Sequence, residues 1–323
     1  MDAISTIKYP ISAEFDSFQT LFYDVLKSDD ELLGRVLEHV ASRSGKMMRP
    51  ILTLLLSKSL GEVNQYSYYG ALSLELLHNA SLVHDDVVDE SSERRGLPSV
   101  DAIFDNKVAV LVGDYLLASS LRASSQCTLE IVNVISRLGI SLSRGELLQL
   151  SNIQTDYFSE EVYFEVIKEK TASLFAACGS IAALSHHESD LVVERYRRFG
   201  ELVGLIFQIR DDIFDYHQNI EIGKPTSNDM HEGKLTLPAI YALNASDDVE
   251  MHNLALKIRS LEASDDEISV FTSWVISMDG LLYAENKMDE ICQEALLLIS
   301  DINDQSIKKA LETFLFICKD RKK

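Results

Sequence analysis

Residues 69–89 read YGALSLELLHNASLVHDDVVD, and this stretch decides the fold class. Its apolar side chains recur at the spacing of one helical face, at Leu72, Leu76, Leu77, Ala80 and Val83. Similar stripes occupy residues 107–123, 129–150, 162–185 and 190–216. Only five prolines and 14 glycines interrupt 323 residues, which favours long helices over many turns. The sequence therefore predicts an all-α protein with a single domain over residues 1–323.

The composition is that of a soluble globular protein with a strong acidic excess. Hydrophobic residues make up 46% and charged residues 25%, which excludes general disorder. The net charge of −21 repels phosphate backbones, so we expect no nucleic-acid partner. No stretch reaches the ~18 apolar residues of a membrane span, and MDAISTIKYP at the N-terminus does not resemble a signal peptide. Four scattered cysteines suit a reducing compartment, so we expect a cytoplasmic location.

Two aspartate clusters share the spacing DDxxD. The first, in LVHDDVVDE, comprises Asp85, Asp86 and Asp89. The second, in FQIRDDIFDY, comprises Asp211, Asp212 and Asp215. Because positions i and i+4 lie on one helical face, each cluster stacks two carboxylates that repel unless a cation lies between them. A solvated acidic face is the ordinary alternative, but the repeated pattern favours Mg²⁺ sites that bridge to an anion, and Mn²⁺ would also accept these ligands.

Basic residues accompany both clusters. Lys46 and Arg49 lie three positions apart in GKMMRP, and Arg94 and Arg95 follow the first cluster by one loop. Further cations occur in mid-chain and after the second cluster, at Lys170, Lys224 and Lys234. Arginine binds phosphate through a planar fork and lysine supplies a point charge. Each residue alone would be an ordinary surface cation, but the set predicts a pocket for two diphosphates.

An ordered set of motifs resembles the trans-isoprenyl diphosphate synthases, the polyprenyl synthetase family. In chain order it reads GKMMRP, ELLHNASLVHDDVVDESSERRG, VGDYLLA, RGELLQL, EKTASLF, FQIRDDIFDY, GKPTSND and GKLTLP. The resemblance implies the isoprenoid synthase fold, a helical bundle around a deep central cavity with the aspartate motifs facing each other across its mouth. It further implies a homodimer that adds isopentenyl diphosphate head-to-tail to an allylic diphosphate. Ionisation would be assisted by about three Mg²⁺ ions and followed by proton loss.

The resemblance also assigns roles to individual residues. All six aspartates would be metal ligands or support them. The allylic diphosphate would be bound by Arg94, Lys170, Lys224 and Lys234. Isopentenyl diphosphate would be bound by Lys46, Arg49, His78 and Arg95. The catalytic residues would be Lys170, Thr171 and Gln208, with Thr171 and Gln208 near the reacting allylic carbon. Met47 replaces the arginine that is more usual in the family motif, so we expect it to pack, and we expect His84 to be structural.

Small side chains before the first cluster predict a long product. Ala80 and Ser81 lie about one turn before Asp85, where short-chain members often carry an aromatic block. We then expect the channel floor at Leu77 or Leu74. A helical turn rises about 5.4 Å, close to one isoprene unit, which favours an all-trans product of about C30–C45, with octaprenyl (about C40) preferred. If Ala80 and Ser81 only help helices to pack, a short-chain farnesyl or geranylgeranyl synthase is the alternative.

Two further hypotheses have less support. A non-catalytic helical partner subunit of a heteromeric synthase would usually have lost aspartates, whereas all six are present. A terpene cyclase would carry a different second metal motif.

We expect the long, apolar prenyl product to be handed to a membrane or to a membrane enzyme. The preferred primer and the pathway are not encoded in these patterns.

Overall fold

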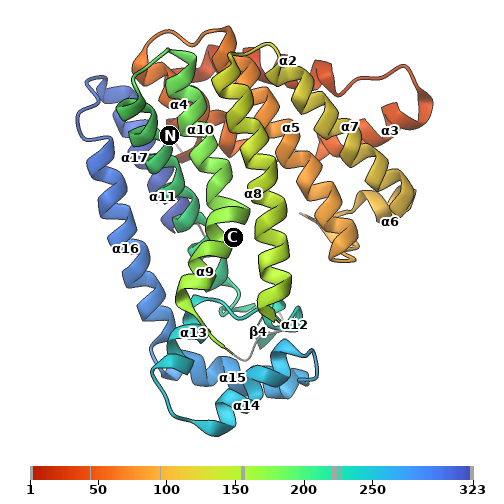
Figure 1. Cartoon of the computed structure of the whole chain (residues 1–323), viewed down its shortest axis with the longest axis vertical. Helices are drawn as coiled ribbons and strands as arrows, with labels where there is room; N and C mark the ends of the chain where they lie inside the picture. The colour runs from red at the N-terminus through yellow and green to blue at the C-terminus, as the bar shows by residue number, and fades with distance from the viewer. Residues whose placement is uncertain are drawn as a thin grey trace. The chain divides into compact units, whose positions relative to one another are not determined.

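The protein is described by a computed structural model that covers residues 3–43, 45–94, 96–153, 157–219, 224–225 and 227–320. This described part is almost wholly helical, which confirms the predicted all-α class (Figure 1). The strands within it form only two short antiparallel hairpins, β1–β2 and β3–β4.

The elements follow one another along the chain with these bounds. They are α1 (Ala3–Lys8), η1 (Tyr9–Ile11), α2 (Ser12–Val25), α3 (Glu31–Ser42), α4 (Met48–Leu60), α5 (Gln65–Val88), β1 (Glu93–Arg94), β2 (Leu97–Pro98), α6 (Val100–Phe104), α7 (Asn106–Ser124), α8 (Leu129–Ile153), α9 (Glu160–Ile167), η2 (Lys168–Ala172), α10 (Ser173–Ser185), α11 (Asp190–Phe214), β3 (Gln218–Asn219), β4 (Lys224–Pro225), α12 (Asn228–His231), α13 (Leu237–Asn244), α14 (Val249–Arg259), α15 (Asp265–Ser277), α16 (Gly280–Leu298) and α17 (Gln305–Asp320).

The contacts of the chain divide it into two compact units. Unit 1 comprises Met1–Ile140, Leu174–Gly200 and Leu298–Phe314. Unit 2 comprises Ser141–Ser173, Glu201–Leu297 and Leu315–Lys323. The single domain and the deep central cavity that we expected stay predictions.

Helix α5 is the centre of unit 1. Asn64 caps its N-terminus by accepting hydrogen bonds from the backbone N–H groups of Tyr66 (2.9 Å) and Ser67 (3.2 Å). The helix packs against α4 and α7, and α7 lies beside it in Figure 1. Every member of its predicted apolar stripe is buried, and so is Leu74. Because neighbours cover more than one face, α5 also buries polar side chains, among them His78 and Asp86.

Helices α10 and α11 touch through their backbones within unit 1. A Cβ atom on Gly179 would lie 1.9 Å from the carbonyl oxygen of Tyr196, and one on Gly200 would lie 2.0 Å from that of Phe175. Neither position can accept a side chain unless the helices separate. Glycine at these two positions therefore allows α10 and α11 to pack closely.

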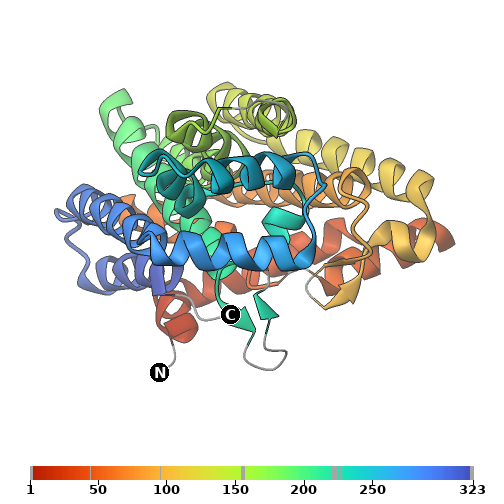
Figure 2. The ribbon, with the colours of Figure 1, turned by 90° about the horizontal axis from the view of Figure 1, so that it is seen from below.

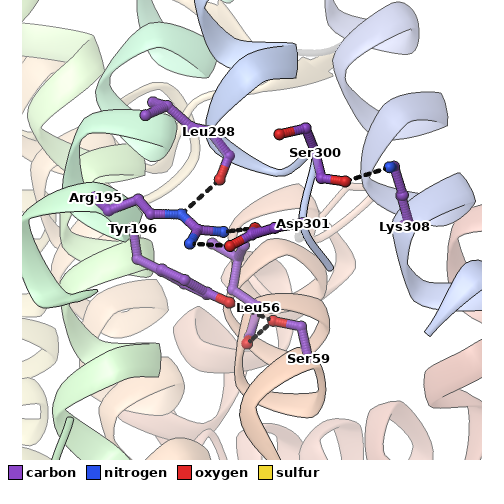
Figure 3. A network of polar contacts seen from close by, with 8 residues as sticks. All are labelled: Leu56, Ser59, Arg195, Tyr196, Leu298, Ser300, Asp301 and Lys308. Atoms are coloured by element: carbon purple, nitrogen blue, oxygen red, sulfur yellow. Dashed lines mark hydrogen bonds and ion pairs between the residues drawn. The ribbon is translucent and has the colours of Figure 1, made fainter. Parts of the chain in front are cut away.

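A polar network fixes the first turns of α11 in unit 1 (Figure 3). Arg195 forms a forked ion pair with Asp301 and donates from Nε to the carbonyl oxygen of Leu298 at 2.6 Å. The neighbouring Tyr196 hydroxyl lies 2.9 Å from Ser59 Oγ on α4. The start of α11 is thus tied both to α4 and to the end of α16.

Unit 2 has its own apolar core. It is built by α12 to α15 together with loop residues that precede α12 and α13, and α14 and α15 run side by side (Figure 2). The core includes Tyr216, Leu235, Leu243, Ile258 and Phe271, all of them buried. This cluster supports the residues that precede and follow β3 and β4.

We predict that Gly179→Ala lowers the free energy of unfolding by about 1–3 kcal/mol, because the new methyl group forces α10 away from α11. The matched control is Gly139→Ala on α8, where an added Cβ meets nothing within 4 Å. That change should stabilise slightly, by up to about 1 kcal/mol, through helix propensity. Denaturant unfolding of both variants measures the difference. Equal stabilities would contradict the role given to the helix contact.

Candidate functional site

The first aspartate cluster lies at the end of α5 in unit 1, with Asp85 and Asp86 in the last turn and Asp89 directly after it. Asp86 is buried, and its Oδ2 lies 3.4 Å from Nη2 of Arg43, itself almost buried. Asp85 is partly exposed and Asp89 is exposed, and the N–H of Asp89 donates to the carbonyl oxygen of Asp85 at 2.8 Å. Asp85 and Asp89 are thus accessible to a cation, whereas Asp86 faces the interior and supports the helix end through Arg43.

His84 fastens this helix end to α7. Its Nε2 lies 3.2 Å from the carbonyl oxygen of Val110 and 3.5 Å from Oδ1 of Asp114. The ring occupies the space where Gly113 lacks a side chain, since a Cβ there would lie 2.1 Å from Nε2. The VGDYLLA motif therefore receives His84, in keeping with the structural role expected of it.

The residues expected to bind isopentenyl diphosphate are described in part. Lys46 is exposed, and the Arg49 guanidinium lies 5.0 Å from the ring centre of Phe175. His78 is buried within α5. Met47 is buried, as expected of a packing residue, and has a left-handed backbone (φ 51°). Arg95 and the side chains of Arg94 and Lys224 lie outside the described residues.

Unit 2 contains a pocket with a volume of about 200 Å³. Its lining brings together five residues that the sequence motifs predict for the site, namely Lys170, Thr171, Gln208, Asp212 and Lys234. They come from η2, from α11 and from the loop before α13, so residues more than 60 positions apart meet here. The lining also includes residues that the motifs did not predict, among them Gln149, Asn152, Tyr163, Asp229 and Arg259.

The pocket carries a chain of hydrogen bonds. Thr171 Oγ1 donates to Gln208 Oε1 at 2.7 Å, and Gln208 Nε2 donates to Asp212 Oδ1 at 2.8 Å. The hydroxyl of Tyr163 donates to the other oxygen, Asp212 Oδ2, at 2.6 Å. Both carboxylate oxygens of Asp212 are therefore occupied, and the Gln208 amide is held in one orientation.

Lys170 and Thr171 lie on η2, a π-helical segment between α9 and α10. Such wide turns are rare and occur often at functional sites. The Lys170 ammonium pairs with Glu146 and donates to Gln149 Oε1 at 3.2 Å. Lys234 is paired with Glu232 at 2.5 Å. Each described lysine of the pocket is thus held by a glutamate.

The second aspartate cluster contributes to an excess of negative charge in unit 2. Burial, and then the neighbouring Asp215, raise the pKa of Asp212, while hydrogen bonds from Tyr163 and Gln208 oppose the rise. Burial and the charges of Asp212 and Asp215 raise the pKa of Asp229. Asp215 accepts hydrogen bonds from the backbone N–H groups of Asn228 and Asp229, both at 2.9 Å, and so holds the start of α12.

These carboxylates fit a cation site that a ligand completes. Oxygen donors that repel one another suit Mg²⁺, which commonly takes few protein ligands and fills its shell with water and phosphate oxygens. Among the described residues, no three His, Cys, Asp or Glu side chains are grouped so as to hold a metal by themselves. None of the described helices has the length and apolar run needed to cross a bilayer.

The pocket residues that were missed differ in the signal they leave in the sequence. Asp229 lies in GKPTSND and Gln149 lies in RGELLQL, so both belong to motifs that carry the family resemblance. Tyr163 and Arg259 lie in no such motif, and only the packing of unit 2 places them at the pocket.

We predict that Tyr163→Phe destabilises the protein by about 1–3 kcal/mol, because it removes a hydrogen bond from the buried carboxylate of Asp212. The lost hydrogen bond should also raise the pKa of Asp212 further, since that bond lowers it. Denaturant unfolding measures the stability. The matched control is Tyr157→Phe, whose ring is 70% exposed and should cost much less. Equal costs at both positions would contradict the prediction.

Comparison with known proteins relates the chain to prenyl synthases, both in sequence and in structure. The family model described as polyprenyl synthetase matches residues 30–273. The octaprenyl diphosphate synthase of Haemophilus influenzae is 33% identical over 301 residues, which are 92% of this chain and 90% of that protein. The crystal structure of geranylgeranyl pyrophosphate synthase from Bacteroides thetaiotaomicron has a TM-score of 0.87 and 46% identity, over 99% of this chain and 100% of that one. A Caulobacter crescentus polyprenyl synthase, complexed with calcium and isoprenyl diphosphate, has a TM-score of 0.91 and 28% identity, over 99% and 98% of the two chains.

Proposed function

The chain belongs to the polyprenyl synthetase family, and from this premise we propose that it is a long-chain all-trans polyprenyl diphosphate synthase. It is a prenyltransferase of the trans-prenyl diphosphate synthase class with the all-α isoprenoid synthase fold. Its substrates in this proposal are isopentenyl diphosphate and an allylic diphosphate, and the product contains about six to nine isoprene units, with about eight preferred. We also propose a homodimer that passes its apolar product to a membrane.

One observation carries the proposal further than family membership. The pocket of unit 2 collects two lysines, a threonine hydroxyl, an oriented glutamine amide and a buried carboxylate. In the proposed reaction, Lys170 and Lys234 bind the allylic diphosphate and stabilise the charge that develops on it as the carbon–oxygen bond breaks. Arg94 and Lys224 complete this set, by resemblance to the family.

The neutral groups of the pocket suit the cationic carbon left behind. The Thr171 hydroxyl donates a hydrogen bond to Gln208, so the lone pairs of its oxygen can face a positive charge. Neither Thr171 nor Gln208 is a strong nucleophile, and they stabilise the allylic cation without trapping it. The double bond of isopentenyl diphosphate attacks this carbon. By resemblance to the family, Lys46, Arg49, His78 and Arg95 bind that second substrate. The departing diphosphate then takes the proton that is lost.

The aspartates would hold Mg²⁺. Asp85 and Asp89 are the accessible ligands of the first cluster, and Asp211 is the proposed ligand of the second. Asp86, Asp212 and Asp215 are engaged with Arg43, with Tyr163 and Gln208, and with the start of α12, which suits a supporting role. When bound, about three Mg²⁺ ions would neutralise diphosphate charge and so promote its departure. Mn²⁺ is an acceptable substitute.

The product length has two candidates. Ala80, Leu77 and Leu74 are buried and Ser81 is partly buried, which fits both the wall of a closed channel beside α5 and ordinary helix packing. The octaprenyl diphosphate synthase relative favours a long product. The geranylgeranyl pyrophosphate synthase structure, at 46% identity, favours a short product as the second candidate.

We predict that the purified chain, given Mg²⁺, labelled isopentenyl diphosphate and farnesyl diphosphate, makes a ladder ending near about eight units. Mass spectrometry identifies the products. Ala80→Phe should shorten them, because an aromatic ring fills the channel about one turn before Asp85. A wild-type ladder that stops at the geranylgeranyl length would favour the short-chain candidate. An absence of turnover with any primer would favour a non-catalytic partner subunit.

We predict that Asp85→Ala lowers turnover by about 100-fold or more, because it removes a ligand for the metal that stabilises the leaving group. Chelation of divalent cations should abolish wild-type turnover, and added Mg²⁺ should restore it. The matched control is Asp24→Ala, which removes an exposed carboxylate paired with Lys27 and should leave turnover unchanged. Wild-type turnover in Asp85→Ala would contradict the metal assignment.

A further inference from the structure

The RGELLQL motif of α8 is in close contact with η2. A Cβ on Gly145 would lie 2.9 Å from the backbone nitrogen of Lys170, 2.8 Å from its Cγ and 2.9 Å from Cβ of Glu169. The backbone of α8 therefore touches η2, the π-helical segment, at Lys170. A larger residue at position 145 would push the two elements apart.

The same motif holds the far end of the Lys170 side chain. Glu146 Oε2 forms an ion pair with the Lys170 ammonium, and Gln149 Oε1, one turn later at the pocket wall, accepts from it at 3.2 Å. Arg144 pairs with Glu165 at 2.7 Å and lies 3.6 Å from Glu169, so it spans the start of η2. Four residues of one motif thus hold a single short segment.

We propose that Glu146 is a positioning residue for the allylic diphosphate site, acting through Lys170. This inference rests on the proposed function, in which Lys170 binds that diphosphate. A lysine ammonium has three N–H donors on a flexible stem. Glu146 and Gln149 occupy two of them, which leaves the third for a ligand in the pocket that Lys170 lines.

Neutralising the charge of Lys170 is the alternative role for Glu146, and it does not by itself explain why a glutamate lies there. We call this alternative charge balance. The chain already carries a net charge of −21, so it has no shortage of acidic residues to compensate a lysine. A carboxylate beside a diphosphate site repels the ligand, which lowers affinity unless the carboxylate also arranges a group that binds. Side chains of Lys170 and Glu146 are 24% and 20% exposed, so their geometry is largely fixed by packing.

Two variants of Glu146 separate position from charge. Glu146→Asp keeps the charge and withdraws the carboxylate by one methylene group, whereas Glu146→Gln keeps the reach and an acceptor oxygen but loses the charge. Positioning predicts that Glu146→Asp raises KM for the allylic diphosphate about three- to tenfold, with kcat nearly constant. Glu146→Gln should raise KM less than Glu146→Asp does. Charge balance predicts the reverse order, and that order would overturn the proposal.

Further variants show whether the effect passes through Lys170. In a Lys170→Gln background, Glu146→Asp should add no further change in KM, because the group that it positions is gone. A full additional effect there would overturn the proposal. Gln149→Leu, which removes the second acceptor, should raise KM in the same direction. Glu130→Asp, the same change at the exposed first turn of α8, should leave KM unchanged.

The outcomes also distinguish this inference from the function on which it rests. Wild-type turnover with equal KM values in both Glu146 variants would overturn the positioning role alone. Absence of wild-type turnover with any allylic primer would overturn both. Thermal unfolding of each variant, compared with that of the wild type, separates a loss of folding from a change in KM.

Discussion

The carboxylate of Asp212, which is 3% exposed, is the constraint around which the pocket of unit 2 is organised. A buried carboxylate is strongly unfavourable unless donors surround it. Tyr163 on α9 and Gln208, one turn earlier on α11, supply those donors. Because Gln208 must turn its N–H towards Asp212, its carbonyl oxygen faces Thr171 on η2. A requirement of burial thereby places the polar groups that we propose take part in the reaction.

The anion binding proposed for so acidic a chain would depend on local arrangement and not on net charge. The two described pocket lysines are each paired with a glutamate, Lys170 with Glu146 on α8 and Lys234 with Glu232 in its own loop. Such pairs fix flexible side chains, at the cost of negative charge near the ligand. The surplus of carboxylates in the same unit suits metal ions that arrive with the diphosphate. Cations on the chain and cations from solution would then share the work of neutralising the substrate.

The sequence predicted the helical class and the stripe of α5 because a 3.6-residue period is a local property. The ordered motifs also predict Lys170, Thr171, Gln208 and Lys234 as site residues, and the structure brings these four together. Partners such as Arg43 for Asp86, 43 positions away, leave no periodic mark and depend on tertiary packing. The same holds for Tyr163. Neither pattern nor motif revealed that Lys170 lies on a π-helical segment.

That segment also sets the phase of a long helical run. The chain stays helical from Glu160 to Ser185, and the wide turn over Lys168–Ala172 accommodates extra backbone within it. Because an α-helix turns about 100° per residue, inserting or deleting one residue in its regular turns rotates the residues beyond that point by about that angle. A π-helical turn instead absorbs one extra residue locally, so deleting that residue from Lys168–Ala172 should leave α9 and α10 each in contact with its present neighbours. Insertions or deletions in the regular turns of α9 or α10 should therefore be far less tolerated than substitutions there.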